Sequence, residues 1–274
     1  MSYPIALLSI FTSLFLLTTA IVYYRGRERR LLLKTLRTMP FPEIWRTYLL
    51  RTVHYPRLTA QARESIERSV LEFVHTKTFS GIGLDVTDEM KVVIAFYACL
   101  MVSNRAGDGY PSLQSVLIYS DDFVVDELHE HGGIVSQGRS VLDGQSSHDT
   151  VVLSWYDAEA EAYHPSEHNV IIHEFAHILD FEDGLSDGVP LLPNPEEKTW
   201  EHVLGHAYRS LEKALEHGHL SEKYQLLGDY AATNEAEFFA VASERFFMRP
   251  EQLHHHFPKL YTLLESFYGI SPKK

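Results

Sequence analysis

The chain has 274 residues, and 45% of them are hydrophobic, which is enough apolar material for a large globular domain. The formal net charge is −13, so no phosphate-binding basic surface is expected, and this argues against direct binding of nucleic acid. A single cysteine, Cys99, excludes an internal disulfide, and its place in the apolar run 92–102 predicts a buried, inert thiol.

The first predicted element is an apolar helix over residues 5–24, which carry no charge and suit a bilayer-spanning segment. Basic residues follow it and none precede it, which by the positive-inside rule puts the C-terminal side in the cytoplasm. We therefore expect residues 1–38 to be a single-pass anchor with a basic juxtamembrane segment, on the cytoplasmic face of the inner membrane. The alternatives are a cleaved signal peptide, with a passable site at Thr18-x-Ala20, or a soluble cytosolic protein.

Residues 39–274 are expected to form one functional domain of the α+β class. Helices are predicted over Pro42–Val53, Thr59–Phe79 and Thr87–Val102, and again from Pro165 to the end, around a long irregular loop at 182–199. Short strands are predicted over Ser115–Tyr119, Phe123–Glu127, Ile134–Gln137 and Val151–Trp155. This order of elements indicates a mostly helical domain with a small β-sheet beside a helical core.

The segment His173-Glu174-Phe175-Ala176-His177 indicates metal-dependent hydrolysis. On a helix, residues four apart lie on the same face, so both imidazoles can reach one metal ion. Glu174 projects at a neighbouring angle, where a carboxylate can deprotonate water. The surrounding residues are apolar, which predicts a buried helix. Polar side chains inside such a helix are costly, and a bound metal ion would explain their presence. Pro165 and Ser166 predict its start, with Ser166 as the N-cap and Glu167 in the first turn.

A catalytic zinc ion usually has three protein ligands, so a third must come from elsewhere in the chain. The best candidates lie on a helix that Thr233 or Asn234 can cap, and they are Glu235, Glu237 and Glu244. Glu237 and Glu244 share one face, and the alanines between them allow a close approach to the motif helix. The residues alone leave these carboxylates open as alternatives.

Other histidines compete weakly for this role. His202 and His206 are four apart, but no glutamate follows His202, and an exposed helix face is the simpler interpretation. The consecutive residues 254–256 point in three directions on a helix and indicate a polar surface. Asp180, one turn after His177, can either accept the second N–H of a ligand imidazole or cap local backbone, and both roles remain open.

Several separated blocks resemble the Mlc titration factor A family of bacterial zinc peptidases, from about residue 40 to residue 272. The blocks are Pro40–Trp45, Val151–Trp155, Asn169–Asp180 with its HEFAHILD core, Asp187–Pro190, Tyr230–Phe247 and Leu260–Tyr261. One departure is His148-Asp149-Thr150, which stands where the family usually has Gly-Pro and affects the rim of the substrate cleft.

The resemblance implies a zincin-like core related to the gluzincin peptidases, with Zn²⁺ bound by His173, His177 and Glu237. It also implies that Glu174 is catalytic and that Tyr230 lines the site. Glu244 is then expected to support a ligand from behind. By resemblance, cleavage is expected to be aminopeptidase-like.

We therefore expect a zinc metallopeptidase that acts on a peptide or protein, with Glu174 as general base and Tyr230 as a donor to the oxyanion. The strand at 151–155 is expected to lie at a sheet edge and pair with an extended substrate. The alternative, also implied by the resemblance, is a binding protein that sequesters a transcriptional repressor, with hydrolysis secondary. A structural zinc protein is a third, weaker interpretation.

Overall fold

The computed structural model describes residues 3–105, 107–120, 149–192, 194–218 and 221–272, except for the side chains of residues 3–10, 22, 25 and 194–196. The chain divides into two compact units, Met1–Phe41 and Pro42–Lys274. Each unit is described by itself.

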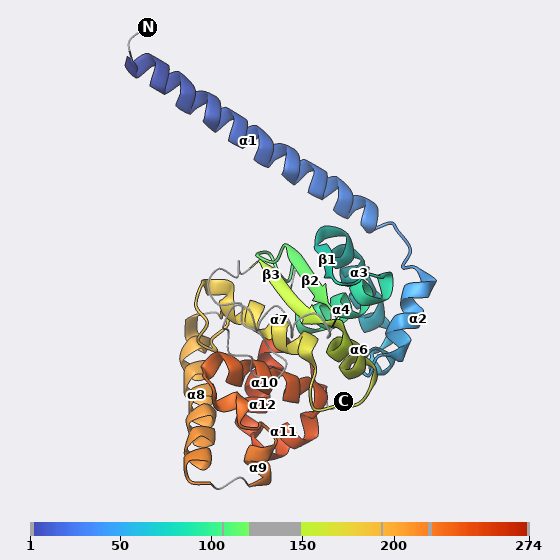
Figure 1. Ribbon diagram of the computed structural model, residues 1–274, viewed down its shortest axis with the longest axis vertical. Coiled ribbons are helices and arrows are strands. Elements are labelled where there is room, and N and C mark those ends of the chain that lie inside the picture. Colours follow the sequence, from blue (N-terminus) through green and yellow to red (C-terminus); the bar gives the residue numbers. More distant parts are fainter. Residues whose placement is uncertain (1–2, 106, 121–148, 193, 219–220, 273–274) are drawn as a thin grey trace. The chain divides into compact units, whose positions relative to one another are not determined.

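The first unit is built around one long helix, α1 (Tyr3–Leu36) (Figure 1). Apolar side chains along it are exposed to solvent, Phe11 and Phe15 among them. The predicted anchor at 5–24 lies within α1, and its residues 5–10 and 22 fall outside the described side chains. Across the side chains that are described, no helix is both long enough and apolar enough to span a bilayer, so the predicted anchor is not supported.

The second unit is mostly helical, and Figure 1 shows its elements in chain order. They are α2 (Glu43–Arg51), η1 (Tyr55–Arg57), α3 (Ala60–Thr76), β1 (Thr78–Ile82), α4 (Asp88–Met101), β2 (Ser115–Tyr119), β3 (Thr150–Ser154), α6 (Trp155–Tyr163), α7 (Val170–Asp180), η2 (Phe181–Asp183), α8 (Asn194–Glu216), α9 (Glu222–Gln225), η3 (Tyr230–Ala232), α10 (Glu235–Met248), α11 (Pro250–His256) and α12 (Pro258–Tyr268).

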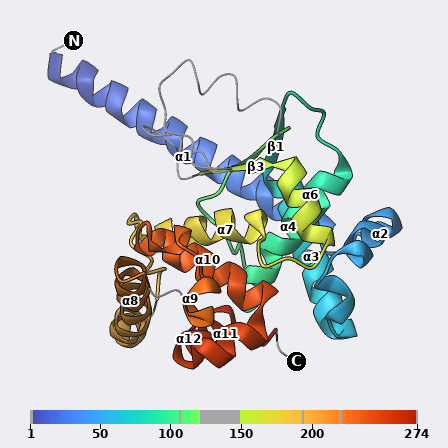
Figure 2. The same cartoon turned by 60° about the horizontal axis from the view of Figure 1, so that its bottom comes forward.

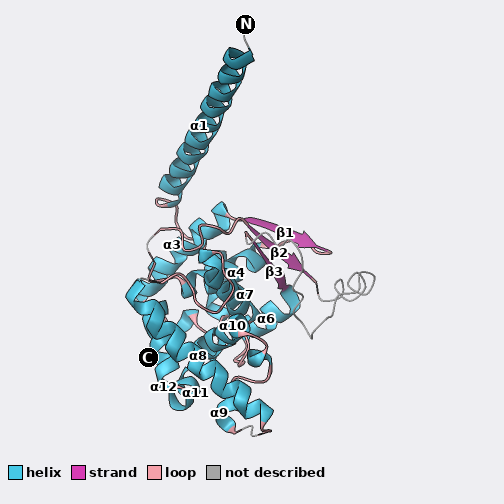
Figure 3. Ribbon diagram, turned by 90° about the vertical axis from the view of Figure 1, so that its left-hand side faces the viewer, coloured by secondary structure: helices cyan, strands magenta, loops and turns pink. Residues whose placement is uncertain are grey.

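Three parallel strands form the described sheet, in the order β1-β2-β3, at one side of the helices (Figure 3). Parallel neighbours need a crossover connection, and α4 supplies it between β1 and β2. The predicted strand at 115–119 is confirmed, and so is the α+β class. The strand predicted at 151–155 is β3, which spans Thr150–Ser154 and ends before Trp155. The strands predicted at 123–127 and 134–137 lie outside the described residues.

Two of the predicted helices begin beside a capping threonine. The hydroxyls of Thr59 and Thr87 accept hydrogen bonds from the third residue of α3 and α4, at 3.2 and 3.3 Å. The prediction that α3 reaches Phe79 was wrong, because β1 begins at Thr78 and pairs with β2. Helix α6 was not predicted, and it shortens the strand before it because Ser154 becomes its N-cap.

The core lies around α7. Helix α4 packs on one side of α7 and α10 on another, as the views in Figures 1 and 2 agree. Residues 92–98 of α4 have no exposed surface, and neither do Ile171 and Ile172 of α7. Cys99 is buried as predicted, and burial raises the pKa of its thiol well above the usual range. The helix that carries the HEFAH segment is therefore the central buried helix that its composition predicts.

Candidate metal centre

Helix α7 begins at an asparagine. The Asn169 side chain accepts a hydrogen bond from the backbone N–H of Ile172 at 3.0 Å, which caps the helix four residues before His173. The predicted cap, Ser166, was wrong: its hydroxyl accepts from the His168 N–H at 3.1 Å in the turn that precedes the helix. Asparagine is as good a cap as serine, and here it stands directly before the apolar run.

Helix α10 is capped in the same way. Of the two predicted caps, Asn234 is the one used, and its side chain accepts from the backbone N–H of Glu237 at 2.8 Å. Thr233 instead donates its hydroxyl to the Tyr230 carbonyl at 2.7 Å. The cap therefore fixes the backbone of the residue whose carboxylate is the expected ligand. Small, buried Ala236 and Ala240 face the core and permit the close approach of α10 to α7.

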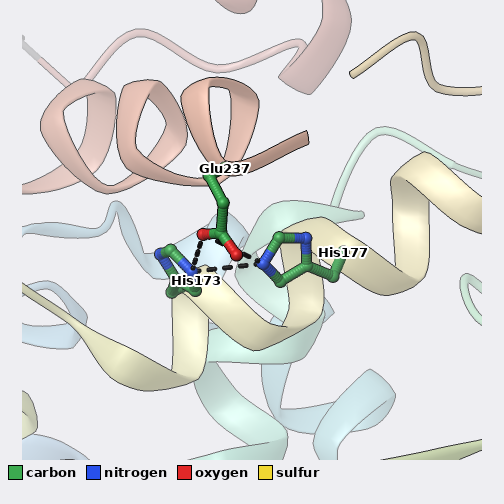
Figure 4. Close-up of side chains that lie close together, drawn as sticks. All are labelled: His173, His177 and Glu237. Carbon is green, nitrogen blue, oxygen red and sulfur yellow. Dashed lines mark hydrogen bonds and ion pairs between the residues drawn. The ribbon is translucent and has the colours of Figure 1, made fainter. Parts of the chain in front are cut away.

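The three expected ligands meet at one point, as Figure 4 shows. His173 Nε2 lies 3.1 Å from Glu237 Oε2 and 3.2 Å from His177 Nε2, and His177 Nε2 lies 3.6 Å from Glu237 Oε2. Within the described part of the chain, these residues are the one group of three potential ligands close enough to hold a metal ion.

These separations fit zinc. Zinc–nitrogen and zinc–oxygen bonds of about 2.0–2.1 Å in a tetrahedron place neighbouring ligand atoms roughly 3.3 Å apart. The three measured separations lie on both sides of that value. Two imidazoles and one carboxylate are also a donor set that catalytic zinc sites use, with a fourth position left open.

The electrostatics of the cluster favour a cation. Burial alone would raise the pKa of Glu237, but the imidazoles of His173 and His177 outweigh it and hold this pKa well below the usual range. The carboxylate is therefore charged, as a metal ligand must be. His173 has no exposed surface, whereas the His177 side chain is 27% exposed, so solvent reaches the cluster beside His177.

A second carboxylate fixes His173 from behind. His173 Nδ1 lies 2.6 Å from Glu244 Oε1, and because a carboxylate accepts, the imidazole donates. The lone pair of Nε2 is then left for the metal position. Glu244 is itself fully buried and also accepts from the backbone N–H of Asn169 at 3.1 Å. This is the supporting role that sequence analysis expected for Glu244.

Sequence reasoning missed two other residues that hold the start of α7. Glu161 of α6 accepts a hydrogen bond from the backbone N–H of Val170 at 2.5 Å. Arg245, almost fully buried, donates to the carbonyls of Leu226 and Glu167, and its guanidinium lies 3.5 Å from Glu244. The sequence offers one clue, which is that Glu244 and an arginine stand side by side in a stretch of mostly apolar residues.

The two expected catalytic side chains are positioned differently. Glu174 is partly exposed and has no hydrogen bond or ion pair within the described residues. Tyr230 lies in η3 with its ring centroid 6.1 Å from that of His173, so it borders the ligand cluster. Glu235 lies in the first turn of α10, outside the cluster, as expected for a carboxylate at a helix N-terminus.

The remaining candidates do not join this centre. Asp180 makes no hydrogen bond to His177 within the described residues; burial raises its pKa to about 6, and the Gly188 backbone N–H opposes this effect. Its carboxylate accepts instead from the Ser186 hydroxyl at 3.5 Å, so neither of its two open roles is confirmed. His202 and His206 are exposed, with ring centroids 6.5 Å apart. Residues 254–256 lie on α11, away from any described group of three ligands.

Comparisons with known proteins identify a family for this chain. Residues 24–269 match the family described as glucose-regulated metallo-peptidase M90. A Mlc titration factor A of Klebsiella pneumoniae is 37% identical over 219 residues, which cover 78% of this chain and 82% of that protein. The Mlc titration factor A of Escherichia fergusonii is 34% identical over 226 residues, covering 81% and 82%. An uncharacterized protein of Synechocystis is 32% identical over 249 residues, covering 87% and 88%.

Two histidines one turn apart on a buried helix, joined by a glutamate from a second helix, define a metallopeptidase-like protein with a site suited to a metal ion. The match extends over most of the chain and includes every residue of this cluster. The chain belongs to the glucose-regulated metallo-peptidase M90 family, and the resemblance to Mlc titration factor A is confirmed.

Proposed function

We propose that the protein is a zinc-dependent peptidase. The observation that carries this proposal is the meeting of His173, His177 and Glu237 at separations that suit tetrahedral zinc, in a chain of the M90 family. The donor set and the supporting carboxylate of Glu244 both favour a resident cation over an incidental polar cluster.

Glu174 and Tyr230 have separate roles in the proposed reaction. When bound, zinc supplies a Lewis acid that polarises a peptide carbonyl and lowers the pKa of water. Glu174 is reached by solvent and has no competing partner within the described residues, so it takes a proton from the attacking water. The same carboxylate then returns that proton to the leaving amine. Tyr230, beside His173, donates a hydrogen bond to the oxyanion of the substrate.

Strand β3 is the proposed place for the substrate backbone. It is the outer strand of the described sheet on the side opposite β1, and it packs on α7. An extended peptide can add to such an edge through main-chain hydrogen bonds.

We propose aminopeptidase-like cleavage of small peptides, which the family resemblance favours. Matched peptides with free and acetylated N-termini test this directly, since loss of turnover on acetylation supports it and equal turnover contradicts it.

The zinc site is tested by separating ligands from the base. The purified protein is expected to hold about one zinc ion per chain. His173→Ala together with His177→Ala should abolish stoichiometric binding. Glu174→Gln should retain zinc but lose hydrolysis of a peptide library, because an amide cannot accept the proton from water.

The third ligand has a matched control. Glu237→Gln should weaken zinc binding, whereas Glu235→Gln, in the same first turn of α10 but outside the cluster, should not. Full zinc occupancy in the double histidine variant, or normal affinity in Glu237→Gln with loss in Glu235→Gln, would refute the assignment.

The second candidate function is capture of a transcriptional repressor. It is favoured by the name of the relatives, which describes them as titration factors of Mlc. If capture is the main role, Glu174→Gln should bind the partner and preserve the cellular effect. If hydrolysis is the main role, this variant should lose the effect while it keeps its fold and its zinc. Complementation with Glu174→Gln, with zinc content measured, decides between them.

A further inference from the structure

The turn at Ser186–Val189 lies outside the ligand cluster but between the two helices that supply it. It follows η2, and the carboxylate of Asp187 closes it by accepting from the backbone N–H of Val189 at 3.1 Å. Gly188 is buried and has a φ of +76°, in the left-handed region that favours glycine. The backbone at this position is therefore fixed by local geometry as well as by its neighbours.

On one side the turn is in close contact with α10. A Cβ atom on Gly188 would lie 2.5 Å from the carbonyl oxygen and 2.9 Å from the carbonyl carbon of Glu235. These are backbone atoms of the first turn of α10, which the Asn234 cap holds in place. Glu235 stands two residues before the proposed ligand Glu237, so the contact lies in the same first turn of α10.

On the other side the turn meets α7. The Ser186 hydroxyl lies 3.5 Å from Asp180 Oδ2. Asp180 is the last residue of α7 and follows the ligand His177 by three positions. The turn thus touches each ligand helix within about one turn of a ligand.

A buried tryptophan holds the turn in place through a hydrogen bond. Trp200 of α8 is 1% exposed, and its Nε1–H donates to the Gly188 carbonyl at 2.7 Å. The indole ring packs edge-on against Phe239 of α10, with centroids 5.6 Å apart. Gly188 is therefore held from α8 while it contacts the start of α10.

We propose that Gly188, held by Trp200, is a positioning residue that sets the spacing between α7 and α10 and thereby the geometry of the metal ligands. This inference rests on the proposed zinc site. It assigns a role to the Asp187–Pro190 block, which supplies no ligand. Gly188 acts through Glu237, not on the substrate.

Gly188→Ala tests the contact, and the same connection provides a matched control. Gly184 has a φ of +95°, and a Cβ atom there meets nothing within 4 Å. Gly184→Ala therefore introduces comparable backbone strain without the collision with Glu235. Gly188→Ala is expected to raise the Kd for zinc at least tenfold above that of Gly184→Ala. The visible spectrum of bound Co²⁺ should change in Gly188→Ala but not in Gly184→Ala, because the spectrum reports ligand geometry.

Trp200→Phe gives a second variant should Gly188→Ala fail to fold. Phenylalanine keeps an aromatic ring beside Phe239 but cannot donate to the Gly188 carbonyl. Folded Trp200→Phe is expected to weaken zinc binding severalfold and alter the Co²⁺ spectrum. A wild-type Kd and spectrum in Trp200→Phe, or Gly188→Ala equal to Gly184→Ala, overturns the inference.

Amide exchange in the metal-free protein separates this inference from the zinc proposal. Exchange at Glu237 and Phe238, whose N–H groups bond to Asn234, should be faster in Gly188→Ala than in Gly184→Ala. If the wild type binds neither zinc nor cobalt, the proposed function fails, whereas the exchange result still tests the coupling. Equal exchange in the two alanine variants overturns the coupling whatever the metal does.

Discussion

His173 and Glu244 form a fully buried pair in which Nδ1 and Oε1 are 2.6 Å apart. The carboxylate determines which imidazole nitrogen carries the proton, and so which nitrogen is available to a metal. Glu244 is in turn held by the Asn169 N–H and lies beside the Arg245 guanidinium. The orientation of one ligand is therefore fixed from helix α10, which also supplies Glu237.

Glu244→Gln should lower zinc affinity by about 10- to 100-fold, because the neutral amide holds the imidazole less firmly and leaves it less basic. Competition with a chromophoric chelator measures the change. Glu235→Gln, near the start of the same helix and outside the cluster, is the control and should bind as wild type. Thermal unfolding of both metal-free variants separates a loss of fold from a loss of affinity. Unchanged affinity in folded Glu244→Gln would contradict the prediction.

Tyr230→Phe should reduce kcat by about 10²-fold or more if its hydroxyl stabilises the oxyanion, while zinc affinity stays within about twofold. The ring remains beside His173, so packing is retained and only the donor is lost. Steady-state kinetics together with zinc content checks this. A parallel loss of zinc would show instead that Tyr230 supports the ligands.

Removal of zinc should destabilise the fold. A ligand that binds only the native state at 100 times its Kd adds about 2.7 kcal/mol to the free energy of unfolding. Thermal unfolding with excess zinc and with chelator should therefore differ clearly in Tm. The variant His173→Ala/His177→Ala should show no such difference. A zinc-dependent Tm in that variant would point to metal bound elsewhere.

His54 should make the protein acid-sensitive. Burial, aided by the charge of Arg57 and opposed by the hydrogen bond to the Phe247 carbonyl, lowers the pKa of His54 from 6.5 to about 4. Between these values the unfolded chain binds the proton and the native state does not, so stability falls as pH falls. The loss attributable to this residue is about 2 kcal/mol at pH 5 relative to pH 8.

His54→Gln keeps a donor for Phe247 and does not titrate. Denaturant unfolding of the metal-free proteins should show His54→Gln less stable than wild type at pH 8, with the difference shrinking by about 2 kcal/mol at pH 5. Parallel stability curves for the two proteins would show that His54 does not titrate on unfolding.

Local rules predicted much of this protein from its sequence. Two predicted helices began at Thr59 and Thr87, and these residues are the N-caps of α3 and α4 in the structure, because a capping residue stands next to the helix that it caps. The His173–His177 pair is equally local, since one helical turn joins the two residues. By contrast, only Lys77 separates α3 from β1, and the pairing of β1 with β2 shows only in three dimensions.

The long-range contacts of the site were the hardest to predict. From the residues alone, Glu235, Glu237 and Glu244 were all possible ligands, because helix periodicity cannot show which turn of α10 faces α7. Arg245 and Glu161 were missed since their partners, Glu167 and Val170, lie on other elements. The predicted anchor at 5–24 rested on composition, and the described residues give it no support.

The ligands stand far apart in the chain, with α8, α9 and η3 between His177 and Glu237. During synthesis, a growing chain that has completed α7 therefore has only two of its three ligands. A metal ion held by all three proposed ligands could be captured only after α10 has emerged and docked, which would make loading a late step of maturation. A truncated copy that ends after α8 would keep the HEFAH segment and still have no metal centre. In shortened or rearranged relatives, the presence of that segment alone is not a sign of activity.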